Sequence, residues 1–180
     1  MFSEHKMTTE YNGFVKIYFQ KLLNSIIKIG DLDRDNLTIL DYGAGYGMIK
    51  KIMSIKNKTV TVINYDIKPE LSDTLDWHKE NFNVVVANEV FYTFDKEDLE
   101  QLLVEFKQYN VNIEVIVGIS KQSFIKNIGK IIFGQQGAHN STKILPKEEI
   151  TILSKHMDII DHKSVWLLAD IYRLCFKKEM

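Results

Sequence analysis

The stretch Ile39-Leu40-Asp41-Tyr42-Gly43-Ala44-Gly45-Tyr46-Gly47 decides the fold of this 180-residue chain. An apolar run ends there in three glycines at alternate positions, and a helical pattern follows. Glycine lets the backbone turn sharply and approach a ligand, while the first turn of a helix presents unpaired N–H groups. The stretch predicts a strand, a tight loop and a helix start, with a nucleotide-containing cofactor as the natural occupant. A glycine-eased turn without any ligand is the alternative.

Apolar runs and helical patterns alternate outward from this loop. The runs are rich in β-branched residues and end in polar ones, as the strands of parallel sheets do. The expected strands are residues 37–41, 59–63, 82–87 and 113–119. The expected helices are residues 11–29, 48–55, a helix capped by Asp95, and 146–156. Two closing runs, residues 157–167 and 170–176, predict a terminal hairpin, and the alternation as a whole indicates an α/β fold with a parallel sheet.

Length and composition limit the classes of protein that fit. The chain can bury one hydrophobic core, so we expect a single domain over residues 1–180. Its 23 basic and 24 acidic residues give a net charge of −1, which disfavours a nonspecific nucleic-acid binder. The single Cys175 excludes an internal disulfide, and no metal site is expected. Without an apolar run of about 20 residues or a signal peptide, a cytoplasmic protein without membrane insertion is expected.

The spacing of the glycines argues against a nicotinamide cofactor. The dinucleotide fingerprint places its third glycine three residues after the second, which would be position 48, but Met48 stands there and Gly47 comes one residue earlier. A reductase that uses such a cofactor is disfavoured for the same reason. Asp66 ends the next expected strand, where a carboxylate can accept hydrogen bonds from both hydroxyls of a ribose. A strand-end turn is the alternative role of Asp66.

Three segments together resemble the class I S-adenosylmethionine-dependent methyltransferases. They are Asp41-x-Gly43-x-Gly45-x-Gly47, the run 62–66 that ends in Asp66, and residues 82–91 followed by a capped helix. The resemblance implies a Rossmann-like, doubly wound, mostly parallel seven-stranded sheet whose last strand is antiparallel. The terminal hairpin would supply that strand. It also implies S-adenosylmethionine as the cofactor, residues 1–30 as a helical cover and residues 120–145 as an insert on the acceptor side.

The resemblance also assigns cofactor roles to individual residues. Asp41 and the glycine loop would contact the methionine part, Asp66 the ribose, and Asn88 the methionine amino group. Asp76 or Trp77 would contact adenine, although the 15 residues of segment 67–81 are too few for a full helix and a full third strand. A half-buried packing role is the alternative for Trp77. The expected cofactor-binding residues are Asp41, Gly43, Ala44, Gly45, Asp66, Ile67, Asp76, Trp77 and Asn88.

The sequence gives fewer indications of which residues contact the methyl acceptor. Methyl transfer needs alignment and exclusion of water, and an acceptor protonated at neutral pH also needs a base. Tyr92 and His139 are the candidates, His139 because it alone among the histidines lies in a glycine-bounded polar loop. A loop histidine that faces water is the alternative. No Asn-Pro-Pro-Tyr-like segment follows Asn88, so a small molecule methylated on oxygen or nitrogen is expected. A non-catalytic module that binds the cofactor remains the alternative function.

Overall fold

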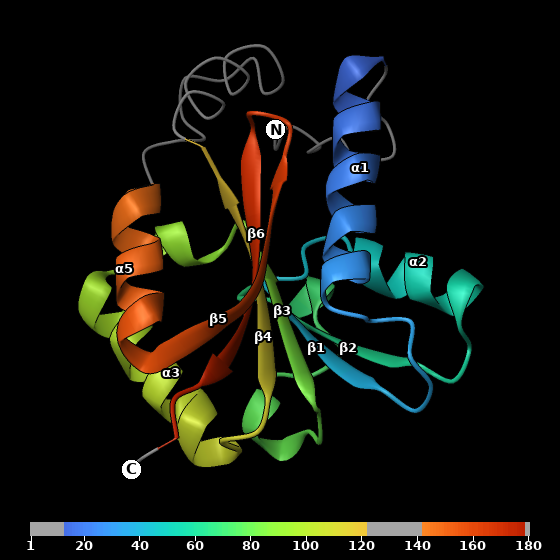
Figure 1. The fold of residues 1–180 in the computed structure, drawn as a ribbon. Helices are drawn as coiled ribbons and strands as arrows, with labels where there is room; N and C mark the ends of the chain where they lie inside the picture. The colour runs from blue at the N-terminus through green and yellow to red at the C-terminus, as the bar shows by residue number, and fades with distance from the viewer. Residues whose placement is uncertain (1–12, 122–141, 179–180) are drawn as a thin grey trace, which may run out of the picture.

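The computed structural model describes residues 13–121 and 142–178, which form a six-stranded sheet of order β2-β1-β3-β4-β6-β5 (Figure 1). The first four strands pair in parallel, and β6 lies antiparallel between β4 and β5. This arrangement confirms the α/β class and the antiparallel end of the sheet. The strands are β1 (Thr38–Tyr42), β2 (Thr61–Tyr65), β3 (Val84–Asn88), β4 (Glu114–Ser120), β5 (Met157–Val165) and β6 (Ala169–Phe176).

Helices cover both faces of the sheet, because its central strands are apolar on both sides. In β3, Val85 and Ala87 join the core beneath α3 and α5, while Val84 and Val86 join the core beneath α1 and α2. Figure 1 shows these two pairs of helices on opposite sides. The helices are α1 (Phe14–Ile29), α2 (Met48–Lys56), α3 (Lys96–Tyr109) and α5 (Pro146–His156). The 3-10 turns are η1 (Pro69–Leu71), η2 (Trp77–Lys79) and η3 (Phe91–Thr93).

The expected seventh strand is absent from the described part of the chain, so the prediction of seven strands is wrong there. The segment between β2 and β3 holds only the turns η1 and η2, and β2 is therefore an edge strand. Asp73 covers part of this edge: its N–H donates to the carbonyl oxygen of Asn64 at 2.8 Å, and its carboxylate accepts from the N–H of Asn64 at 2.7 Å. These two contacts take the place of hydrogen bonds that a neighbouring strand would make with Asn64.

The remaining elements follow the expected order closely. Helix α5 has the predicted bounds, with Pro146 at its first turn and the Glu148 carboxylate accepting from the N–H of Leu145 at 3.0 Å. The terminal hairpin is present, and α1 packs against the face of the sheet that holds Val84 and Val86. Within the described residues, no helix is long and apolar enough to cross a membrane. Most of the expected insert, residues 122–141, lies outside the described residues.

Candidate functional site

The glycine loop lies at the carboxyl end of β1, directly before α2. Gly43, Gly45 and Gly47 have positive φ angles of 73°, 51° and 64°, which L side chains rarely adopt. The N–H groups of Gly43 and Ala44 donate to the carbonyl oxygen of Tyr65, at 2.7 and 3.1 Å. These hydrogen bonds hold the loop against the end of β2. The positive φ angles explain why glycine occupies the three positions.

A cavity of about 190 Å³ opens beside this loop. Five predicted cofactor-binding residues line it: Asp41, Gly43, Ala44, Gly45 and Asn88. Helices α1 and α2 contribute an apolar side through Phe19, Leu23, Met48 and Ile49. A Cβ atom built on Gly45 would have no neighbouring heavy atom within 4 Å. The space beside this glycine is therefore open to a ligand.

Asp41 is a buried acid in the wall of this cavity, with 4% of its surface exposed. Burial, and secondarily the charge of Asp66, raises the pKa of Asp41 to about 7. The carboxyl therefore holds a proton over a range of pH in which an exposed aspartate is ionised. A cation bound beside it would lower the pKa again and restore the carboxylate, because opposite charge favours the charged form. The cavity is thus electrostatically suited to a positively charged ligand group.

Asp66 follows β2 and already accepts two backbone hydrogen bonds. Its Oδ2 accepts from the N–H of Gly45 at 2.9 Å, and its Oδ1 accepts from the N–H of Lys68 at 3.0 Å. A carboxylate offers about four acceptor positions, so both oxygens keep capacity for a further donor such as a hydroxyl. The next residue, Ile67, is 92% exposed. Neither Asp66 nor Ile67 lines the cavity, but Asp66 accepts a hydrogen bond from Gly45, which does line it.

Asn88 forms the end of β3 and closes the cavity on that side. Its Oδ1 atom is buried and has no hydrogen-bond partner among residues 13–121 and 142–178. A Cβ atom on Gly118 of β4 would collide with this oxygen, so glycine is required there for the amide to fit. A buried acceptor without a donor costs about 1–3 kcal/mol. A donor group on a ligand would offset that cost.

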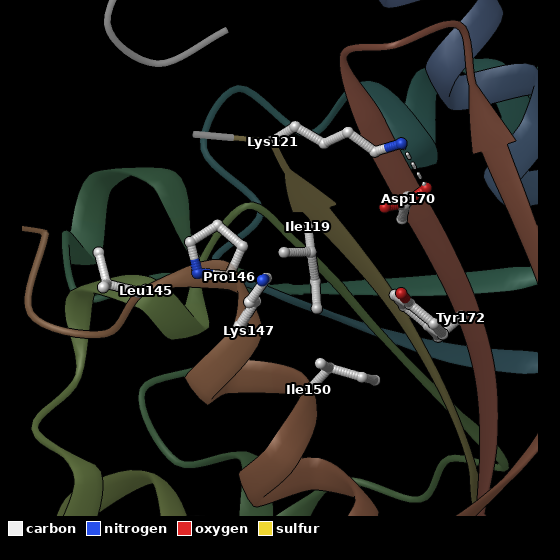
Figure 2. A pocket seen from close by; sticks show the side chains of 8 residues that line it. All are labelled: Ile119, Lys121, Leu145, Pro146, Lys147, Ile150, Asp170 and Tyr172. Atoms are coloured by element: carbon white, nitrogen blue, oxygen red, sulfur yellow. Dashed lines mark ion pairs between the residues drawn. The ribbon is translucent and has the colours of Figure 1, made fainter. Parts of the chain in front are cut away.

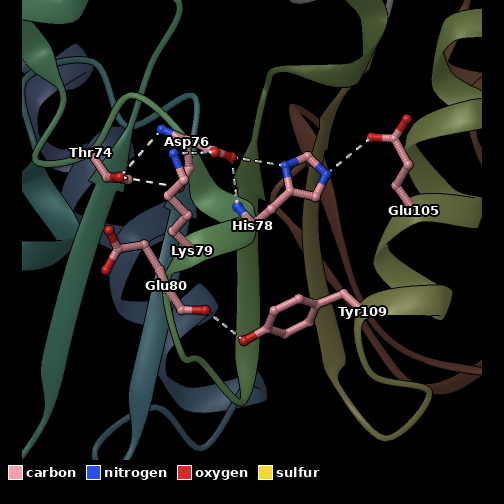
Figure 3. A network of polar contacts seen from close by, with 7 residues as sticks. All are labelled: Thr74, Asp76, His78, Lys79, Glu80, Glu105 and Tyr109. Carbon is pink, nitrogen blue, oxygen red and sulfur yellow. Dashed lines mark hydrogen bonds and ion pairs between the residues drawn. The ribbon is translucent and has the colours of Figure 1, made fainter.

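The two residues expected to contact adenine, Asp76 and Trp77, both make contacts within the protein, and Figure 3 shows those of Asp76 with Thr74, His78 and Lys79. Asp76 caps η2 by accepting from the N–H of His78 at 3.2 Å, and it pairs with Lys79 at 3.1 Å. Trp77 is 3% exposed, with its ring 3.7 Å from that of His78 and 4.7 Å from that of Phe106. The indole is a core side chain and presents no open face to a ligand.

Of the two predicted catalytic residues, only Tyr92 lies among the described residues. Tyr92 lies half-buried in η3, and burial, followed by the charges of Glu89 and Glu149, raises its pKa to about 12. Its backbone carbonyl accepts from the N–H groups of Lys143 and Ile144, at 2.9 and 3.2 Å. His139 lies outside the described residues, so its role stays a prediction.

A second cavity, of about 360 Å³, lies at the carboxyl end of β4 beside the first turn of α5 (Figure 2). Its wall is mostly apolar, with Ile119, Pro146 and Ile150 facing Tyr172. Lys121 extends from the end of β4 to Asp170 on β6, at 3.2 Å. The cavity lies next to the expected acceptor-side insert in the chain, and its size and lining suit a small organic molecule.

Two acids at this edge of the sheet were not predicted as site residues. Glu89 directly follows Asn88 with a φ angle of 58°, and its carboxylate accepts from the hydroxyl of Ser120. Glu149 on α5 is 1% exposed. Burial, followed by the charge of Glu89, raises the pKa of Glu149 to about 8. One feature of the sequence could have indicated that Glu149 is buried. It precedes the buried Ile152 and Leu153 by three and four positions, which places all three on one face of a helix. No metal-binding group of three or more His, Cys, Asp or Glu is present in the described part.

Comparisons with known proteins bear on the fold. No family model matches the sequence, and no curated protein matches it. Among solved structures, the chain is similar to the PH0226 protein from Pyrococcus horikoshii OT3, with a TM-score of 0.70 at 11% identity over 98% of this chain and 96% of that one. The similarity is therefore one of fold and extends over nearly the whole of both chains.

Two further solved structures of similar fold are methyltransferases. The N-methyltransferase NodS from Bradyrhizobium japonicum WM9, in complex with S-adenosyl-L-homocysteine, has a TM-score of 0.57 at 14% identity, covering 98% of this chain and 94% of that one. Magnesium protoporphyrin IX methyltransferase (ChlM) from Synechocystis PCC 6803, with bound SAH, has a TM-score of 0.55 at 12% identity, covering 93% and 89%. The chain has the fold of the class I methyltransferases, as the sequence predicted.

Proposed function

We propose that this chain, which has the class I methyltransferase fold, binds S-adenosylmethionine and transfers its methyl group to a small molecule. One observation carries the proposal: Asp41, the glycine loop and Asn88 converge on one cavity at the carboxyl ends of β1 and β3. Ligands of open α/β sheets bind at this edge, beside the loop that leads from a strand into a helix. The solved structures of similar fold that hold S-adenosylhomocysteine support the choice of cofactor.

The residues present fit the charges of this cofactor. Its methionine part carries an ammonium group, for which the buried Asp41 carboxyl and the Asn88 amide oxygen are suitable acceptors. Asp66 keeps acceptor capacity for the ribose hydroxyls while it holds Gly45 in place. Because Trp77 is buried, we assign the adenine contact to the exposed side chain of Ile67, next to Asp66. An apolar side chain so exposed gains by covering a flat aromatic base.

The cofactor supplies a methyl group on a positively charged sulfur, which a nucleophile displaces in line. The protein's part is to position the acceptor, to exclude water and to accept a proton where the acceptor carries one. The apolar wall of the second cavity, with Ile119, Ile150 and Tyr172, suits the body of an organic acceptor. The near-neutral net charge gives no reason to expect a nucleic acid in that place.

Calorimetry with three ligands tests the cofactor assignment. We expect S-adenosylmethionine and S-adenosylhomocysteine to bind with a stoichiometry of about one, and NADH not to bind, because the glycine spacing departs from the dinucleotide pattern. Binding of NADH alone would contradict the proposal. The non-catalytic alternative predicts binding without turnover. It is tested by mass spectrometry of a panel of small acceptors incubated with protein and S-adenosylmethionine, in which every methylated product counts against it.

A further inference from the structure

The second cavity is lined by charged groups as well as by its apolar wall (Figure 2). The end of β4, the start of α5 and the strand β6 contribute the lining. Its apolar and aromatic side chains are Ile119, Leu145, Pro146, Ile150 and Tyr172. Its charged side chains are Lys121, Lys147 and Asp170. The volume of about 360 Å³ lies within the range of small-molecule sites, roughly 300–1,000 Å³. The charged groups therefore decide which kind of small molecule fits.

The carboxylate of Asp170 finds its partners within the protein. Its Oδ1 atom accepts from the hydroxyl of Ser164 at 2.5 Å, and the Lys121 ammonium lies 3.2 Å from the same oxygen. The ring Nε2 of His162 is a further neighbour, at 3.4 Å. Figure 2 shows Lys121 extending from the end of β4 toward Asp170. The two opposite charges balance each other, so this ion pair adds no net charge to the cavity.

Lys147 is the charged lining residue that lacks such a partner in the described part of the chain. It is exposed in the first turn of α5, and within residues 13–121 and 142–178 its ammonium makes no hydrogen bond or ion pair. The next residue, Glu148, pairs with Lys96 at 2.6 Å. Glu149 is buried, and burial raises its pKa to about 8, so it is mostly uncharged at neutral pH. The cavity therefore has a net positive charge, and that charge belongs to Lys147.

The position of the cavity brings its occupant close to the cofactor site. Asn88, which lines the loop cavity, pairs in register with Gly118, and the next residue on β4 is Ile119 of the second cavity. The strand β6, which carries Tyr172, lies on the other side of β4. Neighbouring strands are about 4.8 Å apart, so the second cavity lies one to two strand spacings, about 5–10 Å, from the strand of Asn88. A molecule anchored there can extend across the end of β4 toward the cofactor.

We propose that the second cavity binds a methyl acceptor that has an apolar body and a carboxylate, and that Lys147 binds the carboxylate. This proposal rests on the proposed function and deepens it, because the class of small molecule was left open. An acceptor with an ammonium group would meet the like charge of Lys147, and a neutral acceptor would leave that charge without a partner. An organic acid instead buries its apolar part against Ile150 and Tyr172 and places its charge beside the ammonium.

The probe is 2-naphthoate, and 2-naphthamide is its neutral counterpart of nearly the same shape. Binding is measured by NMR at pH 6.5 in protein labelled with carbon-13 at the isoleucine methyl groups, with and without S-adenosylhomocysteine. We expect 2-naphthoate to shift the signals of Ile119 and Ile150 and not that of Ile55, which is 85% exposed on α2. The amide should bind roughly 5-fold more weakly, the effect of losing an ion pair that stays in contact with water.

Three variants locate the charge that matters. Lys147→Gln should weaken binding of 2-naphthoate roughly 5-fold and leave that of 2-naphthamide unchanged. Lys147→Glu places an acid in the first turn of a helix, where the helix dipole favours it, and should weaken 2-naphthoate further. The matched control is Lys163→Gln, which removes the same charge from β5. Lys163 pairs with Ile171, between the cavity residues Asp170 and Tyr172, so its side chain lies on the opposite face of the sheet. This control should bind as the parent protein does.

Equal binding of 2-naphthoate and its amide would overturn the proposal, and so would unchanged binding of 2-naphthoate by Lys147→Gln. An equal loss in Lys163→Gln would show an effect of net charge alone and would also overturn it. Acceptors in the mass-spectrometric panel are tested as pairs of acid and amide, and an amide methylated as fast as its acid would contradict the acceptor class. Failure of S-adenosylhomocysteine to bind would overturn the proposed function instead, because 2-naphthoate is also measured without it.

Discussion

Replacing Asp41 by asparagine should make the cofactor-free protein more stable at neutral pH while weakening its binding of the cofactor. Burial and the charge of Asp66 raise the pKa of Asp41 from 3.8 to about 7. The folded protein therefore holds a proton that the unfolded chain has already released, and stability is lost as the pH rises between these two values. The difference of about three pH units corresponds to about 4 kcal/mol at 1.36 kcal/mol per unit.

Urea denaturation of the cofactor-free protein between pH 4 and pH 8 measures this effect. We expect the free energy of unfolding of Asp41→Asn, relative to the parent protein, to increase by up to about 4 kcal/mol over that range and to level off above pH 7. Asp33→Asn is a control without this dependence, because the hydrogen bond from Lys56 lowers the pKa of Asp33. The stabilising contribution of its carboxylate is present above the unfolded pKa of 3.8, so the effect of this variant should stay nearly constant from pH 4 to pH 8 and be lost only on further acidification.

The same variant tests the role of Asp41 in binding. An asparagine cannot compensate an ammonium group, so we expect the dissociation constant for S-adenosylmethionine to rise roughly 10- to 150-fold. Binding to the parent protein at pH 6.5 should release a proton from Asp41, detected as a dependence of the calorimetric heat on the ionisation enthalpy of the buffer. A stability difference that does not change with pH would refute the assignment of a buried, protonated Asp41. Unchanged affinity would remove Asp41 from the cofactor site.

Two further predictions concern the loop and the ribose. Asp66→Ala should weaken binding of S-adenosylmethionine by about 2–3 kcal/mol in calorimetry, because a charged acceptor for hydroxyls is lost; an unaltered dissociation constant would exclude Asp66 from the site. Gly45→Val should abolish binding while the protein remains folded, since its φ of 51° strains a valine by about 1–2 kcal/mol but no protein atom obstructs the Cβ. The control Gly13→Val shares a positive φ and open surroundings far from the loop in sequence, so retained binding by Gly45→Val, or equal loss in both variants, would contradict the loop assignment.

The sequence predicted those parts of the fold that depend on local signals. Apolar runs set the strands, and the glycines at positive φ set the turn into α2. The length of segment 67–81 already indicated that a full third strand would not fit, yet the resemblance implied seven strands. The structure resolves this conflict with two short turns, because a crossover takes about a dozen or more residues and leaves no room in this segment for a further strand.

The sequence predicted site residues whose position follows from the end of a strand. It did not predict residues whose role depends on how side chains pack in the folded protein. Asp41 and Asn88 end neighbouring strands, so the topology brings them to one cavity. The sequence alone does not distinguish an indole that faces a ligand from one that packs, and Trp77 packs against Phe106. The influence of Glu89 on the pKa of Glu149 depends on the tertiary position of α5, which no local pattern specifies.

The acids at the carboxyl edge of the sheet connect the stability of this protein to its ligands. Asp41 and Glu149 both have raised pKa values, so each removes stability as the pH rises from its model value, 3.8 or 4.5, to about 7 or about 8. In the proposed function a positively charged cofactor compensates Asp41. The cofactor then stabilises the folded state by an amount that increases with its concentration relative to its dissociation constant. Asp41 lies on the buried strand β1 and Glu149 on the buried face of α5, so the apolar cores on the two faces of the sheet hold both acids in place before any ligand binds.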